Sequence, residues 1–173
     1  PAIGPVDIVI ENNRISSVNT VGYPGMPIKE DKRPKLKSGG KEMDCTGMFI
    51  LPGFIDMHGH IGGESQGTPA EYVFKLWMAH GITTVRDPGS FNGLDWVLDQ
   101  KEKSTKNQIT APRLYAYTSF GMGSKQPINN ATQAIEWVRE NAKKGADGIK
   151  FFGHLVKSHR QKVVDVGAIR GLW

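Results

Sequence analysis

The sequence predicts an α/β fold in which a parallel sheet is built from strands that alternate with helices. Strand-like and helix-like segments follow one another at intervals of about 30 residues, which is the pattern of βαβ units. A separate hairpin of apolar and polar residues precedes them. The chain has 173 residues, and its 38% hydrophobic and 23% charged residues are typical of a globular domain.

The first expected element is a β-hairpin over residues 6–19. Apolar residues alternate with other residues up to Asn12 and Asn13, which can form the turn between two strands. Residues 20–43 are rich in Gly, Pro and Lys and indicate a long loop. Cys45 is the only cysteine. It excludes an internal disulfide framework, and we expect it to be a small buried residue.

Four further strands are expected after this loop. The first is short and mostly apolar, as expected for a strand that is covered on both faces. The others are short runs rich in β-branched or aromatic residues, each bounded by loop residues. These four strands are predicted at residues 54–58, 82–86, 113–118 and 148–152.

Three helices are expected between these strands. The first has Thr68 as its N-cap and Glu71 as the partner in a capping box. The second lies within residues 92–103. The third is the clearest, because Asn130 can cap its start and Gly145 can close its end. The buried faces of the first and third helices are predicted to carry Tyr72, Val73, Leu76, Trp77 and His80, and Ala134, Ile135, Val138 and Ala142, respectively.

The net charge of +5 is unevenly distributed. Residues 29–42 and residues 154–173 each carry a net charge of +3, so the rest of the chain is close to neutral. A nucleic-acid binder is expected to spread basic residues over a folded face. We therefore interpret residues 29–42 as a solvated loop and expect no nucleic-acid partner. No apolar run approaches the roughly 18 residues that cross a membrane, so no membrane partner is expected either.

His58 and His60 stand two residues apart at the end of the first strand after the loop. Side chains at positions i and i+2 leave a strand on the same face, so both imidazoles can point to one spot. Imidazole is the usual nitrogen ligand of zinc and related divalent metals, and Gly59 removes bulk between the two rings. The spacing alone is a weak signal and favours two surface histidines on a loop.

Several segments, in order along the chain, resemble the amidohydrolase superfamily. Residues 51–60, Leu-Pro-Gly-Phe-Ile-Asp-Met-His-Gly-His, are similar to its first metal-binding strand. Residues 7–15 resemble its small β-sandwich, and residues 81–87 resemble its second barrel strand. Residues 145–150, Gly-Ala-Asp-Gly-Ile-Lys, resemble the fourth strand of its binuclear members, the Xaa-Pro dipeptidase-like and imidazolonepropionase-like branch. The resemblance covers about residues 5–153.

The resemblance implies the N-terminal part of a (β/α)₈ TIM barrel, with about four strands, beside part of a small β-sandwich. Residues 1–50 would form the partial sandwich, residues 51–153 the first half of the barrel, and residues 154–173 an aberrant basic tail. A complete barrel needs about 250 residues. We therefore expect an N-terminal fragment. The later histidine ligands and the Asp general base of the family are expected downstream, so no catalytic residue is assigned within this chain.

The resemblance also implies a metal site. His58 and His60 would bind the more buried metal, and Lys150, carboxylated by CO₂, would bridge two metals. The cofactor would be one or two divalent ions, with zinc expected. Lys150 as an ordinary lysine remains the alternative.

Neighbouring polar residues are expected to have supporting roles. Asp56 would be structural or would orient an imidazole. Arg86 and Asp87 would form local hydrogen bonds, and His80 would bond to carbonyls at the end of its helix. The Gly-rich loop at residues 119–124 either contacts substrate or has no function in the site.

The implied activity is hydrolysis of carbon–nitrogen bonds in an amide, cyclic amide or dipeptide, through a metal-bound hydroxide. The substrate would be a small molecule, and a homo-oligomer is left open. We expect the 173-residue chain itself to be inactive and prone to aggregate. The alternatives are a mononuclear deaminase of the same superfamily and a non-catalytic scaffold with this fold. A cytoplasmic location is expected, or a periplasmic or secreted one if a signal peptide has been removed.

Overall fold

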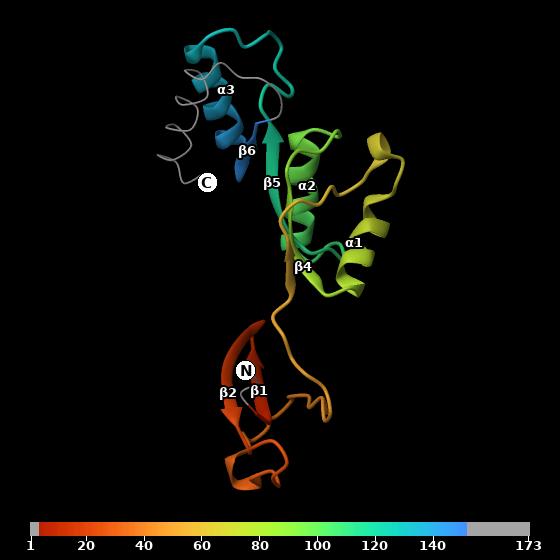
Figure 1. Cartoon of the computed structure of the whole chain (residues 1–173), viewed down its shortest axis with the longest axis vertical. Coiled ribbons are helices and arrows are strands. Elements are labelled where there is room, and N and C mark those ends of the chain that lie inside the picture. The colour runs from red at the N-terminus through yellow and green to blue at the C-terminus, as the bar shows by residue number, and fades with distance from the viewer. Residues whose placement is uncertain (1–3, 152–173) are drawn as a thin grey trace. The chain divides into compact units, whose positions relative to one another are not determined.

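The computed structural model describes residues 4–151 and divides the chain into two compact units, Pro1–Ile50 and Leu51–Trp173. In the first unit, β1 (Val6–Glu11) and β2 (Arg14–Thr20) form an antiparallel hairpin (Figure 1). Asn12 and Asn13 have φ angles of 49° and 60°. A two-residue type I′ turn requires positive φ at both positions, so the predicted turn is confirmed.

The segment after this hairpin is mostly irregular, as expected from its composition. It contains one short 3₁₀ helix, η1 (Glu30–Lys32), between β2 and Ile50. Arg33 ties the segment to the hairpin, because its Nε lies 2.9 Å from a carboxylate oxygen of Asp7. Cys45 is half-buried, so the expectation of full burial is wrong.

The second unit contains a four-stranded sheet whose strands are all parallel. The strands follow one another across the sheet in chain order, as they do in a barrel wound from βα units (Figure 1). The sheet is curled, and this unit has the architecture of half a (β/α)₈ barrel. The strands are β3 (Phe54–Asp56), β4 (Ile82–Asp87), β5 (Arg113–Ser119) and β6 (Gly148–Lys150).

Three helices connect these strands: α1 (Ala70–Ala79), α2 (Leu94–Thr105) and α3 (Ala131–Lys144). Helix α3 has the predicted ends, because the side chain of Asn130 accepts a hydrogen bond from the backbone N–H of Gln133, and Gly145 adopts a left-handed conformation. In the part of the chain that the structure describes, no helix is long and apolar enough to cross a membrane.

The predicted start of α1 is wrong. The N-cap is Pro69, and no side chain caps the helix. The carbonyl of Thr68 instead accepts a 2.6 Å hydrogen bond from Gly63 in an isolated β-bridge. This pairing holds Thr68 in the preceding loop, and Glu71 bonds to Lys75 on the helix surface rather than completing a capping box.

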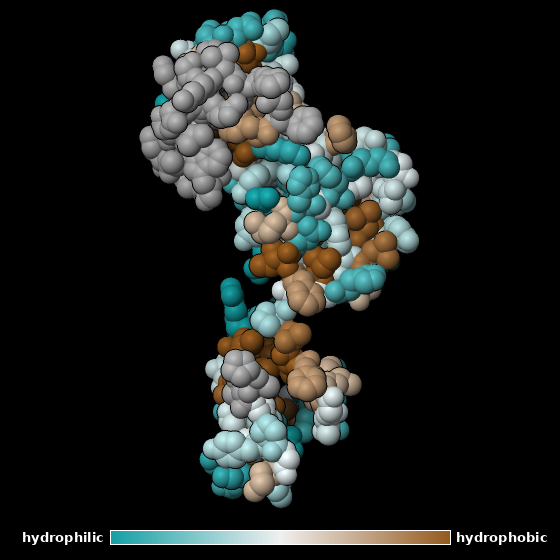
Figure 2. Space-filling view, in the orientation of Figure 1, coloured by the Kyte–Doolittle hydropathy of each residue, from teal (hydrophilic) through white to brown (hydrophobic). Residues whose placement is uncertain are grey.

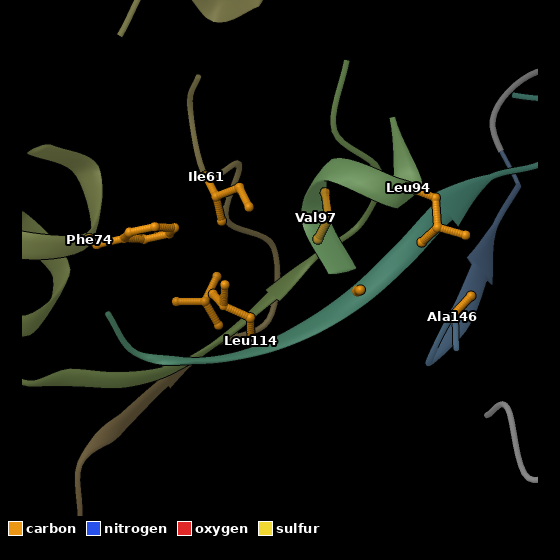
Figure 3. Close-up of a cluster of buried hydrophobic side chains, with 8 residues drawn as sticks. Ile61, Phe74, Leu94, Val97, Leu114 and Ala146 are labelled. Atoms are coloured by element: carbon orange, nitrogen blue, oxygen red, sulfur yellow. The ribbon is translucent and has the colours of Figure 1, made fainter. Parts of the chain in front are cut away.

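The core lies between the sheet and the helices, where α1 and α2 pack against one face of β4 and β5. Figure 3 shows Ile61, Phe74 and Val97 around Leu114, with Leu94 and Ala146 at the end of the cluster nearer β6. Phe74 is the fully buried residue of α1, whereas the predicted Tyr72 and Leu76 are exposed. The main cluster consists of Ile61, Phe74, Val85, Leu94, Val97, Leu114, Ala116 and Ala146.

A second cluster lies under α3 and contains Ala134, Trp137, Val138 and Ile149. Of the stripe predicted for α3, Ala134 and Val138 are buried, while Ile135 and Ala142 are half-buried. Trp137, which was not predicted, is buried in their place.

The opposite face of the sheet is open to solvent. Along β5, Leu114, Ala116 and Thr118 are buried, whereas Arg113 and Tyr115, which alternate with them, are exposed. Strand β3 is shorter than predicted, and its apolar residues are exposed by about 60%. The expectation that β3 is covered on both faces is therefore wrong, because β3 lies at an edge of the sheet and has only β4 as a neighbour among the described strands. Apolar side chains consequently remain at the surface (Figure 2).

Candidate metal site

His58 and His60 lie in the bend that follows β3. The strand ends at Asp56, so the two histidines are not on the strand as predicted. Their rings nevertheless lie side by side, with centroids 5.5 Å apart and planes at 80°. His58 is exposed and His60 is half-buried.

The bend is fastened to the end of β4 through its backbone. The N–H of Gly59 donates to the carbonyl of Arg86 over 3.2 Å, and the Arg86 Nε donates to the carbonyl of Met57 over 2.6 Å. A Cβ on Gly59 would come within 2.7 Å of Trp77 and 2.9 Å of Val85. Glycine is therefore needed between the two histidines for close packing, as the sequence suggested.

Asp87, at the end of β4, is the carboxylate closest to an imidazole. Its Oδ1 lies 3.4 Å from Nδ1 of His60, and its side chain is fully buried. Burial raises the pKa of Asp87, and hydrogen bonds from the backbone N–H groups of Gly89 and Ile61, with the nearby His60, oppose that rise. The local hydrogen bonds expected for Arg86 and Asp87 are confirmed.

Asp56 has a different role from Asp87. Its Oδ1 accepts a 2.9 Å hydrogen bond from the backbone N–H of His58, which stabilises the start of the bend. The structural role expected for Asp56 is confirmed, but the imidazole that needs an orienting carboxylate is next to Asp87. No local pattern indicated this pairing, because Asp87 lies 27 positions beyond His60.

Lys150 stands at the end of β6. It lines a hollow of about 160 Å³ together with His58, so the segment after β3 and the end of β6 contribute to one site. His60 is not among the lining residues. The guanidinium of Arg86 lies 5.3 Å from the ring centroid of Tyr117 within this hollow. Its lining consists of His58, Arg86, Pro88, Tyr117, Ile149 and Lys150.

The side chains available as ligands are of the kind that binds a divalent metal, but they are too few for a complete site. Over residues 4–151, no group of three or more His, Cys, Asp or Glu side chains is arranged to hold a metal ion. The candidates are two imidazoles and one lysine amine. Nδ1 of His60 is buried without a hydrogen-bond partner. Nitrogen donors of this kind suit zinc, which ordinarily takes four ligands, so a complete site needs further ligands.

His80, the loop at residues 119–124 and the basic tail were also singled out from the sequence. Nδ1 of His80 lies 2.7 Å from the Leu76 carbonyl, which confirms its expected structural role. The loop at residues 119–124 begins next to Lys150, whose carbonyl accepts from the N–H of Phe120. A contact of this loop with substrate stays a prediction. The expected basic tail, residues 154–173, lies outside the described residues.

Asn92 links two loops near the site, a role that the sequence did not reveal. Its Nδ2 donates to the carbonyl of Gly62 over 2.6 Å. Its Oδ1 accepts from the hydroxyl of Ser65 over 2.6 Å. Asn92 thus ties the loop after His60 to the loop after β4, two segments that are about 30 residues apart in the chain.

Comparison with known proteins finds similarity to curated adenine deaminases. The chain is 36% identical to adenine deaminase 2 of Rhizobium etli over 105 residues, which cover 54% of this chain and 17% of that protein. It is 42% identical to the adenine deaminase of Methanoculleus marisnigri over 93 residues, covering 49% of this chain and 18% of that protein. The matches thus span less than a fifth of the length of these relatives. No protein-family model matches the chain.

Among solved structures, the bottromycin amidohydrolase has a similar fold. It matches 69% of this chain and 26% of its own chain, with a TM-score of 0.53 and 18% identity. Sequence similarity to adenine deaminases and a fold shared with an amidohydrolase confirm the predicted relationship. The chain is related to the amidohydrolase superfamily, and the similarity covers only part of it.

Proposed function

We propose that this chain forms the first half of the barrel of a metal-dependent hydrolase that cleaves carbon–nitrogen bonds in a small molecule. His58 and His60 would be ligands of one divalent ion, and Lys150, in its carboxylated form, would be a ligand shared with a second ion. The observation that supports this most is that His58 and Lys150, from opposite edges of the sheet, line one hollow. Active sites of such barrels lie at the carboxyl ends of the strands, where both residues are found.

A divalent ion in this place would polarise the scissile carbonyl and lower the pKa of water for attack. The residues of this chain would hold and orient that ion. The amine of Lys150 would add to CO₂, forming an N–C bond and losing one proton, which gives an anionic carbamate. Arg86 and Tyr117 beside Lys150 would form one wall of the site. Amides, cyclic amides and Xaa-Pro dipeptides are the proposed substrates.

Metal binding by the complete 173-residue chain tests this proposal. Zn²⁺ affinity is measured by competition with a chromophoric chelator at pH 8. We expect His58→Ala and His60→Ala each to weaken Zn²⁺ binding by about tenfold or more. Loss of a residue that only supports a ligand already weakens metal binding by about 10- to 100-fold, and loss of the ligand itself should cost at least as much. His80→Ala is the matched control, because the ring of His80 bonds to the Leu76 carbonyl of α1. Equal Zn²⁺ affinity in all four proteins would contradict the ligand assignment.

Carboxylation of Lys150 is tested separately. The chain is incubated with ¹³C-bicarbonate and Zn²⁺, and the carbamate carbon is observed by NMR. The signal should disappear in Lys150→Met and persist in Lys144→Met, which changes an exposed lysine on α3. A carbamate signal that survives Lys150→Met would contradict the binuclear proposal.

The deaminase alternative is favoured by one observation, the sequence similarity to adenine deaminases. A mononuclear deaminase would hold one metal and form no carbamate on Lys150. The number of metal ions bound, combined with the ¹³C measurement, separates the two proposals. A full-length protein that binds no metal would instead support a non-catalytic scaffold.

We also propose that the 173-residue chain has no hydrolase activity of its own and tends to associate. Its described donors are too few for a complete site. Its edge strand β3 and one face of the sheet are exposed, and such surfaces are sites for intermolecular pairing. Ammonia release from adenine, or cleavage of Xaa-Pro dipeptides, by a monomeric chain would contradict this.

A further inference from the structure

Asp87 is a fully buried carboxylate with no role yet in the proposed site. It is the final residue of β4, and its Oδ1 lies 3.4 Å from Nδ1 of His60. An acidic side chain is rarely buried completely unless it is paired or hydrogen-bonded. The position of Asp87 therefore needs an explanation beyond filling the core.

The carboxylate is held rigidly by the backbone around it. Oδ1 accepts a 2.9 Å hydrogen bond from the N–H of Gly89, and Oδ2 accepts a longer bond of 3.4 Å from the N–H of Ile61. Both donors favour the ionised form of the carboxyl group, which is an acceptor only. A side chain fixed in this way can determine which atoms of its neighbour carry hydrogen.

Nδ1 of His60 is the neighbour in question. It is buried and has no hydrogen-bond partner, and Asp87 is the acidic group at ion-pair distance. The 3.4 Å between Nδ1 of His60 and Oδ1 of Asp87 is longer than a well-aligned hydrogen bond. A small rotation of the imidazole toward Asp87 would bring the two atoms to hydrogen-bond distance. A neutral imidazole carries one N–H, and a carboxylate beside Nδ1 favours the proton on that nitrogen. Nε2 would then keep its lone pair.

We infer that Asp87 is the positioning residue of His60, which fixes the Nδ1–H tautomer and leaves Nε2 as the nitrogen that binds a metal. This inference rests on the proposed metal site. Ligand histidines commonly donate their other N–H to a carboxylate, which fixes the ring and raises its basicity. The bond from Arg86 to the Met57 carbonyl and the bond from the N–H of Gly59 to the Arg86 carbonyl hold the rest of the bend against the same strand end.

Asp56 is a control for the role of Asp87, because it supports the backbone of the bend and does not orient an imidazole. It lies close to the same histidines, but its Oδ1 bonds to the backbone N–H of His58. Asp87→Asn keeps the shape of the side chain and one acceptor oxygen, but its amide can donate to Nδ1 and so reverse the tautomer. Asp56→Asn makes the same chemical change at a site where no imidazole depends on it.

The test uses the complete chain at pH 8, above the ordinary imidazole pKa of about 6.5. Long-range ¹H–¹⁵N NMR spectra without metal report the tautomer of His60, and the Zn²⁺ competition assay reports affinity. We expect Nδ1–H in the wild type and Nε2–H in Asp87→Asn. Zn²⁺ binding should weaken by about 10- to 100-fold in Asp87→Asn and remain nearly unchanged in Asp56→Asn.

The outcomes separate this inference from the proposed function. If the wild type binds Zn²⁺ and Asp87→Asn binds it equally well, the inference is wrong and the metal site stands. If the wild type binds no Zn²⁺, the proposed function fails. Should Asp87→Asn not fold, the wild-type spectrum still decides, because an Nε2–H tautomer for His60 would overturn the inference.

Discussion

The two faces of the parallel sheet differ sharply in how their side chains are used. The face toward α1 and α2 buries Val85, Leu114 and Ala116 in a continuous core. The opposite face presents Arg86, Tyr115 and Tyr117, which are exposed or half-buried. The packed face therefore stabilises the fold, and the open face carries the candidate site. Matched substitutions on the two faces should lower the free energy of unfolding by different amounts.

The largest difference is expected between two aromatic residues. Phe74→Ala removes a fully buried ring from the packed side and should lower the free energy of unfolding by about 3–5 kcal/mol. Tyr115→Ala removes a ring that is 42% exposed on the open face, and should cost about 1 kcal/mol or less. Pulse proteolysis in urea, at low protein concentration, measures both. Similar losses would show that the open face is covered in solution.

Two glycines give the next comparison. Gly59→Ala pushes a Cβ against Trp77 and Val85 in the packed side, and should destabilise the chain by about 1–3 kcal/mol. The nearest atoms to a Cβ at Gly148 belong to the half-buried ring of Tyr117, at 2.5 Å, and a side chain on the open face should give way more easily than packed core. We expect a smaller loss for Gly148→Ala in the same urea assay. A larger loss at Gly148 would mean that Tyr117 is held firmly.

Substitution of an acidic residue should cost more stability on the packed side of the sheet than on the outer surface. Asp147 accepts hydrogen bonds from Lys101 and from the N–H of Ala116, both over 2.7 Å, and so links β6, α2 and β5. Asp147→Asn should cost about 1.5 kcal/mol, the lower end for bonds to charged groups. Asp99→Asn removes an exposed pair with Lys103 and should cost about 0.5 kcal/mol or less. Chemical denaturation of both variants, repeated in high salt, checks the order.

The smallest effect is expected within the hollow. Tyr117→Leu removes the ring beneath the Arg86 guanidinium while keeping an apolar side chain. The loss of this cation–π contact should reduce stability by about 0.5–1 kcal/mol. Tyr115→Leu, on the same strand face, is the control. A loss at Tyr117 no greater than at Tyr115 would remove the argument that Arg86 is anchored there.

Elements with local signals were predicted best from the sequence. Helix α3 begins and ends where Asn130 and Gly145 indicate, because both signals act within one helical turn. The hairpin turn at Asn12 and Asn13 is likewise a local property of two residues. The start of α1 failed for the opposite reason, because the bridge between Gly63 and Thr68 competes with a capping box.

The candidate site shows the same division. The sequence picks out His58, His60 and Lys150 as site candidates, and their metal-binding roles remain predictions. It did not indicate that Asn92 ties two loops together or that Asp87, rather than Asp56, lies beside an imidazole. These partners are about 30 positions apart, and only strand pairing brings them together.

The sequence by itself determined the alternation of strands and helices and the position of each candidate ligand near a strand end. These features follow from hydrophobic spacing and from capping and turn residues, which act over a few positions. The tertiary structure decided which side chains meet, which face of the sheet is buried and which carboxylate contacts His60. Those outcomes depend on the pairing of β3 with β4 and on the packing of helices against one face, and no local pattern encodes either.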